Sequence, residues 1–126
     1  VLVCGGMGGV MLHACRGAKS AGGVTIGILP TSDRSSANPY VDYSIPTALG
    51  EARNSIVVRS SDAIIAIGGS FGTLSEIAFA LKFQKPLVGV STWKLIDWKG
   101  DAPSIQYMDE PEKAVMLALK AIGKEV

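Results

Sequence analysis

The chain has 126 residues and a formal net charge of +1, and 48% of its residues are hydrophobic, with 15 glycines and few aromatics. This near-neutral charge gives no electrostatic attraction toward nucleic acid or a membrane surface, so we expect neither as a partner. The sequence shows no signal peptide and no apolar run near the roughly 18 residues of a membrane span. The composition is typical of an α/β domain with short buried strands and glycine-rich turns.

The two cysteines, Cys4 and Cys15, form no disulfide framework and have no metal-ligand spacing with the lone His13. We interpret both as small core residues, since free cysteine is usually buried. Unpaired cysteines favour a reducing, cytoplasmic setting.

The first predicted element is a buried strand over residues 1–4, followed by the glycine-rich loop 5–9 and a helix over 10–21. This order resembles a dinucleotide-type turn, which makes Gly5 and Gly6 candidate ligand-binding residues. The alternative is that these glycines serve only close helix–strand packing. The sequence begins on Val1 directly inside a strand, so we expect a further N-terminal strand–helix unit to precede it.

A second strand is predicted over 24–29, ended by Pro30, and residues 31–40 have the composition of a loop. Within that loop Asp33, Arg34 and Asn38 either contact a ligand or are solvated, and we favour solvation. A short strand over 42–45 and a helix over 48–60 follow. Arg53 lies in this helix, where an arginine is usually a surface ion-pair partner.

The most informative stretch is 64–76, IIAIGGSFGTLSE. It predicts a strand over 64–67, a tight turn at Gly68 and Gly69, and a helix opened by Gly72 and Thr73 that runs to about residue 83. Glycines permit positive φ and close approach of a ligand to the backbone, and the unpaired N–H groups at a helix start bind anions, most often phosphate. The competing interpretation is structural: Thr73 and Glu76 fit a capping box.

The remaining elements are a strand over 87–90, a short strand over 104–108, and a final helix that begins between residues 109 and 112. Trp93 follows the strand 87–90 at the edge where open α/β sheets bind ligands, and either stacks on a flat ring or packs in the core. Trp98 is predicted to serve packing or an oligomer contact. Alternation of strands and helices predicts one α/β domain over 1–126 with a doubly wound, mostly parallel, Rossmann-like sheet.

These motifs together resemble the Lonely Guy (LOG) family, often labelled lysine decarboxylase-like, which includes molybdenum-cofactor carrier proteins. The segments that carry the resemblance are Cys4–Gly6, Gly9–Met11, Gly27–Pro30, Arg53–Asn54, Asp62 and Gly68–Glu76. The resemblance implies that Gly68, Gly69, Gly72 and Thr73 hold a phosphate, and that Arg53 and Glu76 are catalytic residues of N-glycosidic bond hydrolysis. It also implies a homo-oligomer.

Two departures from the family pattern bear on activity: Ile67 replaces a proline and Asn54 replaces a lysine. Both resemble the carrier branch. We therefore expect a carrier or sensor that binds a small phosphorylated ligand, either a nucleotide or a pterin such as molybdenum cofactor. We expect that the protein requires no cofactor. The alternative is a nucleoside 5′-monophosphate phosphoribohydrolase. Lysine decarboxylation is rejected, because pyridoxal phosphate needs a Schiff-base lysine and neither glycine loop contains one.

Overall fold

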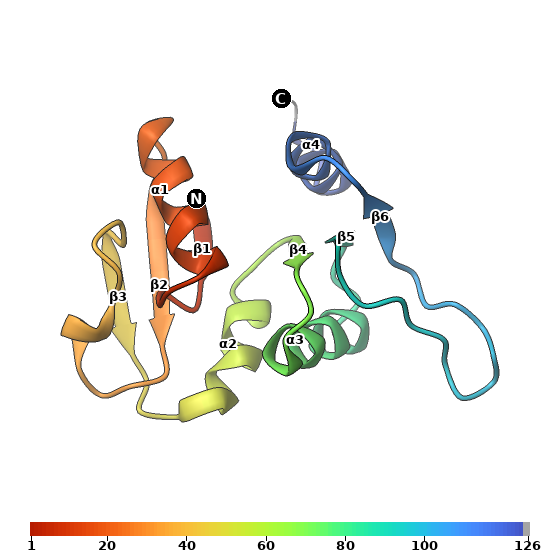
Figure 1. The fold of residues 1–126 in the computed structure, drawn as a ribbon, viewed down its shortest axis with the longest axis horizontal. Helices are drawn as coiled ribbons and strands as arrows, with labels where there is room; N and C mark the ends of the chain where they lie inside the picture. The colour runs from red at the N-terminus through yellow and green to blue at the C-terminus, as the bar shows by residue number, and fades with distance from the viewer. Residues whose placement is uncertain (125–126) are drawn as a thin grey trace. The chain divides into compact units, whose positions relative to one another are not determined.

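The computed structural model describes residues 1–124, and the chain divides into two compact units, residues 1–60 and 61–126. Each unit is a three-stranded sheet with helices, and every strand pair is parallel. Strands and helices alternate along the chain (Figure 1). The predicted α/β architecture with parallel strands is confirmed.

In the first unit, the sheet has the order β1 (Leu2–Cys4), β2 (Thr25–Leu29), β3 (Tyr43–Pro46). The helix α1 (Val10–Ser20) connects β1 to β2, and a 3-10 turn η1 (Arg34–Ser36) lies in the loop before β3. The central strand β2 is the most buried, with Leu29 fully enclosed and Ile28 nearly so. Burying such a side chain contributes about 1.5–3 kcal/mol, so β2 anchors this unit.

Asp42 connects the elements of this unit just before β3. Its Oδ2 accepts hydrogen bonds from the backbone N–H of Thr25 and from Lys19 Nζ, both at 2.9 Å. The backbone N–H of Asp42 in turn donates to Thr25 Oγ1 at 2.8 Å. These contacts hold the pKa of the Asp42 carboxyl below its usual value, with the Lys19 hydrogen bond as the largest cause.

The helix predicted over 48–60 is wrong in its first part. The chain forms a 3-10 turn η2 (Gly50–Arg53), and the α-helix α2 covers only Asn54–Arg59. Ala48 has a φ of 56°, outside the right-handed helical region, so a regular helix cannot begin at this residue. Arg53 therefore lies at the junction between the turn and α2, rather than inside a regular helix.

The second unit contains β4 (Ile64–Ile67), β5 (Leu87–Val90) and β6 (Gln106–Met108), in that order across the sheet. The helix α3 (Phe71–Lys82) connects β4 to β5, and α4 (Pro111–Ala121) follows β6. Figure 1 shows α3 and α4 on opposite sides of these strands. The predicted bounds of β4 and β5 are confirmed, whereas β6 begins two residues later than predicted.

The core on the α4 side is formed by Val88 and Val90 of β5 against Ala114 and Ala118 of α4. The two alanines have almost no exposed surface, and their small side chains let the helix backbone approach the sheet closely. Because α3 lies on the other side of the strands (Figure 1), this sheet is covered on both faces, as a doubly wound fold requires.

Candidate functional site

The loop between β4 and α3 is built for exposure of its backbone. Gly68 has a φ of 85°, a conformation that favours glycine, and it turns the chain away from the end of β4. A Cβ atom placed on Gly68 or on Gly69 would meet no other atom within 4 Å. The space beside these two glycines is therefore open to a ligand.

The start of α3 is capped by Ser70, not by Thr73. Ser70 Oγ accepts a hydrogen bond from the backbone N–H of Thr73 at 3.1 Å, and the two hydroxyl oxygens lie 2.9 Å apart. The predicted capping box of Thr73 with Glu76 is wrong, because the helix starts at Phe71, and Thr73 is its third residue. Glu76 lies in the second turn, half-buried, on the same helix.

The general geometry of a helix start leaves the first N–H groups without intrahelical acceptors. In α3 these are the N–H groups of Phe71 and Gly72, and Thr73 adds a hydroxyl. The positive end of the helix dipole lies at the same point. The arrangement can therefore bind an oxyanion such as phosphate.

The segment after β5 fixes this loop in place. Thr92 Oγ1 donates a hydrogen bond to the carbonyl of Gly68 at 2.5 Å, and Trp93 Nε1 donates to the carbonyl of Ser70 at 3.1 Å. Tyr107 Oη donates to the carbonyl of Trp93 at 2.6 Å. The carboxyl ends of neighbouring parallel strands thus share one hydrogen-bonded cluster at the edge where open α/β sheets bind ligands.

Sequence reasoning missed Thr92 and Tyr107, although both follow or lie on strands of this sheet. It also missed Phe71, whose side chain is 81% exposed and whose ring centroid lies 5.9 Å from that of Trp93. The signal available was their position at the carboxyl edge of the sheet. For Trp93 itself, the structure shows a half-buried ring with a paired N–H group.

The glycine loop of the first unit has a different environment. A Cβ on Gly5 would lie 2.6 Å from Nη2 of Arg53 and 2.7 Å from Sδ of Met11. A Cβ on Gly6, whose φ is 76°, would lie 2.6 Å from Cδ2 of Leu29. Close packing explains the glycine at both positions, and their role in ligand binding stays a prediction.

Arg53 is held in the first unit by its own hydrogen bonds. Its Nε donates to the carbonyl of Ile28 at 3.0 Å, and its Nη1 donates to Oδ1 of Asn54. The guanidinium therefore lies against the backbone of Gly5, where glycine leaves room for it. Its predicted catalytic role remains a prediction.

Asn38 is buried, so its predicted solvation is wrong. Its Nδ2 donates to the carbonyl of Met7 at 2.9 Å, and its backbone N–H donates to the carbonyl of Gly6 at 2.8 Å. The long loop 31–40 therefore supports the glycine loop of the same unit. A buried amide whose side chain bonds to backbone groups of a distant segment leaves no pattern in the sequence.

The two cysteines lie close together, with Sγ atoms 3.5 Å apart and no disulfide. Burial raises the pKa of the Cys4 thiol to about 12. A thiol with this pKa is protonated at neutral pH and is a poor nucleophile. Cys15 is fully buried, as predicted for a core residue.

The predicted site residues thus fall into two groups. Those of the second unit lie on one loop and the helix that follows it: Gly68, Gly69, Gly72, Thr73 and Glu76. In the first unit, Gly5 and Gly6 are consecutive residues, and the guanidinium of Arg53 lies against Gly5.

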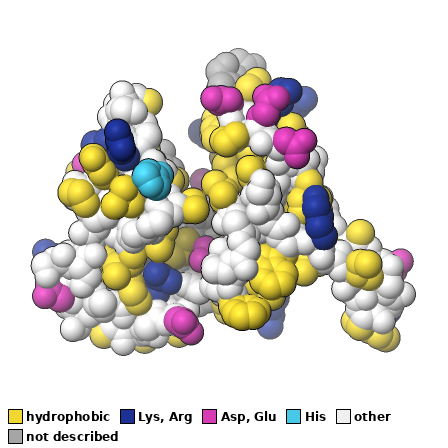
Figure 2. All heavy atoms as spheres, viewed as in Figure 1, with side chains coloured by type: hydrophobic (Ala, Val, Ile, Leu, Met, Phe, Trp, Pro, Cys, Tyr) yellow, Lys and Arg dark blue, Asp and Glu magenta, His cyan; other side chains and the backbone are white. Residues whose placement is uncertain are grey.

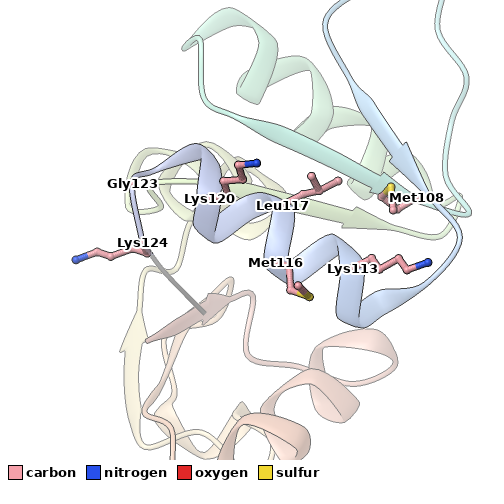
Figure 3. A pocket seen from close by; sticks show the side chains of 7 residues that line it. All are labelled: Met108, Lys113, Met116, Leu117, Lys120, Gly123 and Lys124. Carbon is pink, nitrogen blue, oxygen red and sulfur yellow. The ribbon is translucent and has the colours of Figure 1, made fainter.

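A hollow of about 820 Å³ lies beside α4 and contains none of the predicted residues. Its lining consists of Met108, Lys113, Met116, Leu117, Lys120, Gly123 and Lys124. Figure 3 shows these side chains pointing in different directions, with Lys113 on α4 and Lys124 beyond the end of that helix. The predicted hydrogen-bond donors for a ligand lie instead at the β4–α3 loop, at the start of α3.

Within residues 1–124, no three histidine, cysteine or acidic side chains gather closely enough to hold a metal ion. In the same part of the chain, every helix is too short or too polar to cross a membrane.

The fold and the β4–α3 loop together define a class: a doubly wound α/β protein with a glycine loop suited to phosphate. Comparison with known families agrees with this fold and is more specific about the family. The model of the SLOG cluster4 family matches residues 1–115, and the chain belongs to this family. The resemblance to the LOG-like superfamily is thereby confirmed.

The relatives cover nearly all of this chain. An uncharacterized protein of Archaeoglobus fulgidus is 43% identical over 124 residues, which are 98% of this chain and 78% of that protein. Among solved structures, the molybdenum cofactor binding protein of Rippkaea orientalis is 41% identical, with a TM-score of 0.83 over 98% of this chain and 77% of that one. The molybdenum cofactor carrier protein of Chlamydomonas reinhardtii is 36% identical, with a TM-score of 0.78 over 96% and 76%.

Proposed function

We propose that this chain binds molybdenum cofactor, a pterin that bears a phosphate, and carries it without chemical turnover. The observation that carries the proposal is the 41% identity, over 98% of the chain, to a molybdenum cofactor binding protein. The similarity to a molybdenum cofactor carrier protein supports it independently. Ile67 and Asn54, which resemble the carrier branch, point in the same direction.

In this proposal the phosphate of the ligand lies at the β4–α3 loop. The backbone of Gly69 and the first N–H groups of α3 donate hydrogen bonds to it, and the hydroxyls of Ser70 and Thr73 lie next to them. A helix dipole stabilises such an anion by up to about 2 kcal/mol in a partly buried site. The open space beside Gly68 and Gly69 supports this position, because a Cβ on either glycine would meet no protein atom within 4 Å.

The second candidate function is phosphoribohydrolysis of a nucleoside 5′-monophosphate. One observation favours it: Glu76 lies three residues after Thr73 on α3, so both side chains share one face of the helix that begins at the phosphate loop. A carboxylate there would stabilise the positive charge that develops on the sugar during glycosidic cleavage.

We further propose that the chain acts as a single phosphate-binding domain, in a homo-oligomer, in the cytoplasm. The cysteine usage supports the reducing compartment, because Cys4 and Cys15 are the only two cysteines of the sequence and make no disulfide framework.

The experiment that tests the proposal uses anaerobically purified molybdenum cofactor. The chain is incubated with it and desalted, and the bound molybdenum is counted by mass spectrometry. The expected result is about one molybdenum per binding site, retained without modification of the pterin. Absence of retained molybdenum would contradict the carrier function.

The same preparation is incubated with a panel of nucleoside monophosphates, and free base is followed by chromatography. Glu76→Gln is the matched variant, because it keeps the shape of the side chain and removes its charge. Release of base by the native chain that disappears in Glu76→Gln would replace the carrier proposal with the hydrolase.

A further inference from the structure

Phe71 is an exposed aromatic side chain at the rim of the candidate phosphate loop. It is the first residue of α3 and directly follows the capping Ser70, yet 81% of its surface is exposed. Figure 2 shows hydrophobic side chains on the surface over α3. A single exposed apolar residue needs no explanation, but the ring of Phe71 has an aromatic neighbour in Trp93.

The ring of Phe71 is paired with a tryptophan that is fixed on two sides. The two centroids lie 5.9 Å apart with an interplanar angle of 30°, within the range of favourable aromatic pairs. Trp93 Nε1 donates to the carbonyl of Ser70, and Tyr107 Oη donates to the carbonyl of Trp93. The aromatic pair is therefore positioned before any ligand arrives.

The pair is also tied to the loop that is proposed to hold the phosphate. The Ser70 carbonyl that accepts from Trp93 belongs to the residue that caps α3. Thr92, the residue before Trp93, donates to the carbonyl of Gly68 at the start of the loop. Ser91, which begins this segment, has a φ of 48°, a strained conformation for a residue other than glycine. Strain of this kind persists where the surrounding structure enforces it.

We propose that Phe71 and Trp93 form a stacking platform for the flat heterocyclic ring of a phosphate-bearing ligand. The inference rests on the proposed function for the position of the phosphate, and it adds the group that recognises the ring. Phe71 offers the exposed ring face, and Trp93 holds that ring beside the loop. The platform selects ligands in which a flat ring system and a phosphate belong to one molecule, and it discriminates against sugar phosphates that have no ring system to stack.

The test compares the native chain with Phe71→Ala in equilibrium dialysis against molybdenum cofactor, guanosine 5′-monophosphate and ribose 5-phosphate. The expected result is a loss of about 5- to 150-fold in affinity for a ring-bearing ligand, the range for one lost aromatic stack. Affinity for ribose 5-phosphate is expected to be unchanged. Phe71→Tyr should restore binding, because it retains the ring. Ile96→Ala is the matched control, since Ile96 is 73% exposed in the same unit but belongs to no aromatic pair.

A second readout reports stacking directly. Trp98 is 90% exposed, so Trp98→Phe leaves Trp93 as the only tryptophan without disturbing the fold. Binding of a ring-bearing ligand should change the fluorescence of Trp93, and ribose 5-phosphate should not.

The outcomes separate the two proposals. If the native chain binds molybdenum cofactor and Phe71→Ala binds it equally well, the platform is overturned and the carrier function stands. If the native chain binds guanosine 5′-monophosphate in a Phe71-dependent way but not molybdenum cofactor, the platform stands and the carrier function falls. Failure to bind any of the three ligands overturns both.

Discussion

The two glycine loops of this chain follow the same local plan and differ in what surrounds them. Gly5 and Gly6 follow β1 and precede α1, and Gly68 and Gly69 follow β4 and precede α3. In the first loop, a Cβ on Gly5 would lie 2.6 Å from Nη2 of Arg53, and a Cβ on Gly6 would lie 2.6 Å from Cδ2 of Leu29. In the second loop, a Cβ on Gly68 or on Gly69 would meet no other atom within 4 Å.

The difference shows that a glycine pair between a strand and a helix has two separate physical uses. In the first unit glycine lets a guanidinium and a leucine pack against the backbone, so its absence of a side chain serves stability. In the second unit the backbone faces open space, so the absence of a side chain leaves room for the ligand that we propose. Of the predictions that follow, the first compares the two loops directly, the second tests the contact that holds the open loop, and the third tests the first unit away from its glycine loop.

The largest effect on stability is expected for Gly6→Ala. The new Cβ would lie 2.6 Å from Leu29 Cδ2 and 3.0 Å from the Cα of Gly27, at a φ of 76°. Overpacking and an unfavourable φ together should lower the free energy of unfolding by about 2–4 kcal/mol, measured by urea denaturation. Gly69→Ala is the control and should change it by less than about 0.5 kcal/mol. Equal destabilisation by both variants would remove the contrast between the loops.

An intermediate effect is expected for Thr92→Val, which keeps the shape of the side chain and removes its hydroxyl. The hydrogen bond from Thr92 Oγ1 to the carbonyl of Gly68 is lost. We expect a loss of about 0.5–1.5 kcal/mol in the free energy of unfolding and weaker ligand binding, because the open loop is no longer fixed. Calorimetric titration alongside urea denaturation measures both. Unchanged binding would mean that the brace from β5 does not organise the loop.

The smallest effect concerns the acid stability of the first unit through Asp42. Its hydrogen bond from Lys19 lowers the pKa of the folded carboxyl below the ordinary value of 3.8. The stabilisation is therefore present above the pKa of the unfolded chain and is lost as the pH falls through the lower pKa of the folded state. Urea denaturation between pH 7 and pH 2 should show a decline in stability that is shallower in Asp42→Asn. Parallel curves for the two proteins would contradict the assignment.

Much of the fold could be predicted because its signals are local. β4 and β5 are short apolar runs bounded by turn residues, and their predicted bounds match the structure. The helix over 48–60 was wrong because Ala48 adopts a positive φ that its residue type does not suggest. The cap of α3 was misplaced because Ser70 and Thr73 are both good capping residues, and only the backbone decides between them.

The candidate site was predictable only in part, for the same reason. The glycines of the second loop stand out in the sequence, because strand, glycines and helix start are contiguous. The side chains that support them come from other strands: Thr92 and Trp93 after β5, and Tyr107 on β6. Likewise Asn38 reaches Met7 across 31 residues of sequence. Contacts of this kind depend on the sheet order, which local pattern does not encode.

The most direct test of the account is the affinity of Gly69→Val for molybdenum cofactor. A Cβ atom at this position would meet no protein atom within 4 Å, so the fold should be retained, but the side chain of valine would fill the space proposed for the phosphate. Gly17→Val is the matched control, because Gly17 is an exposed glycine of α1 where an added Cβ would also meet no atom within 4 Å beyond the backbone of its own helix. The account predicts that Gly69→Val loses at least about 100-fold in affinity, as expected when an anion loses its backbone donors, while Gly17→Val binds like the native chain. Native affinity in a folded Gly69→Val variant would contradict the claim that the β4–α3 loop holds the ligand.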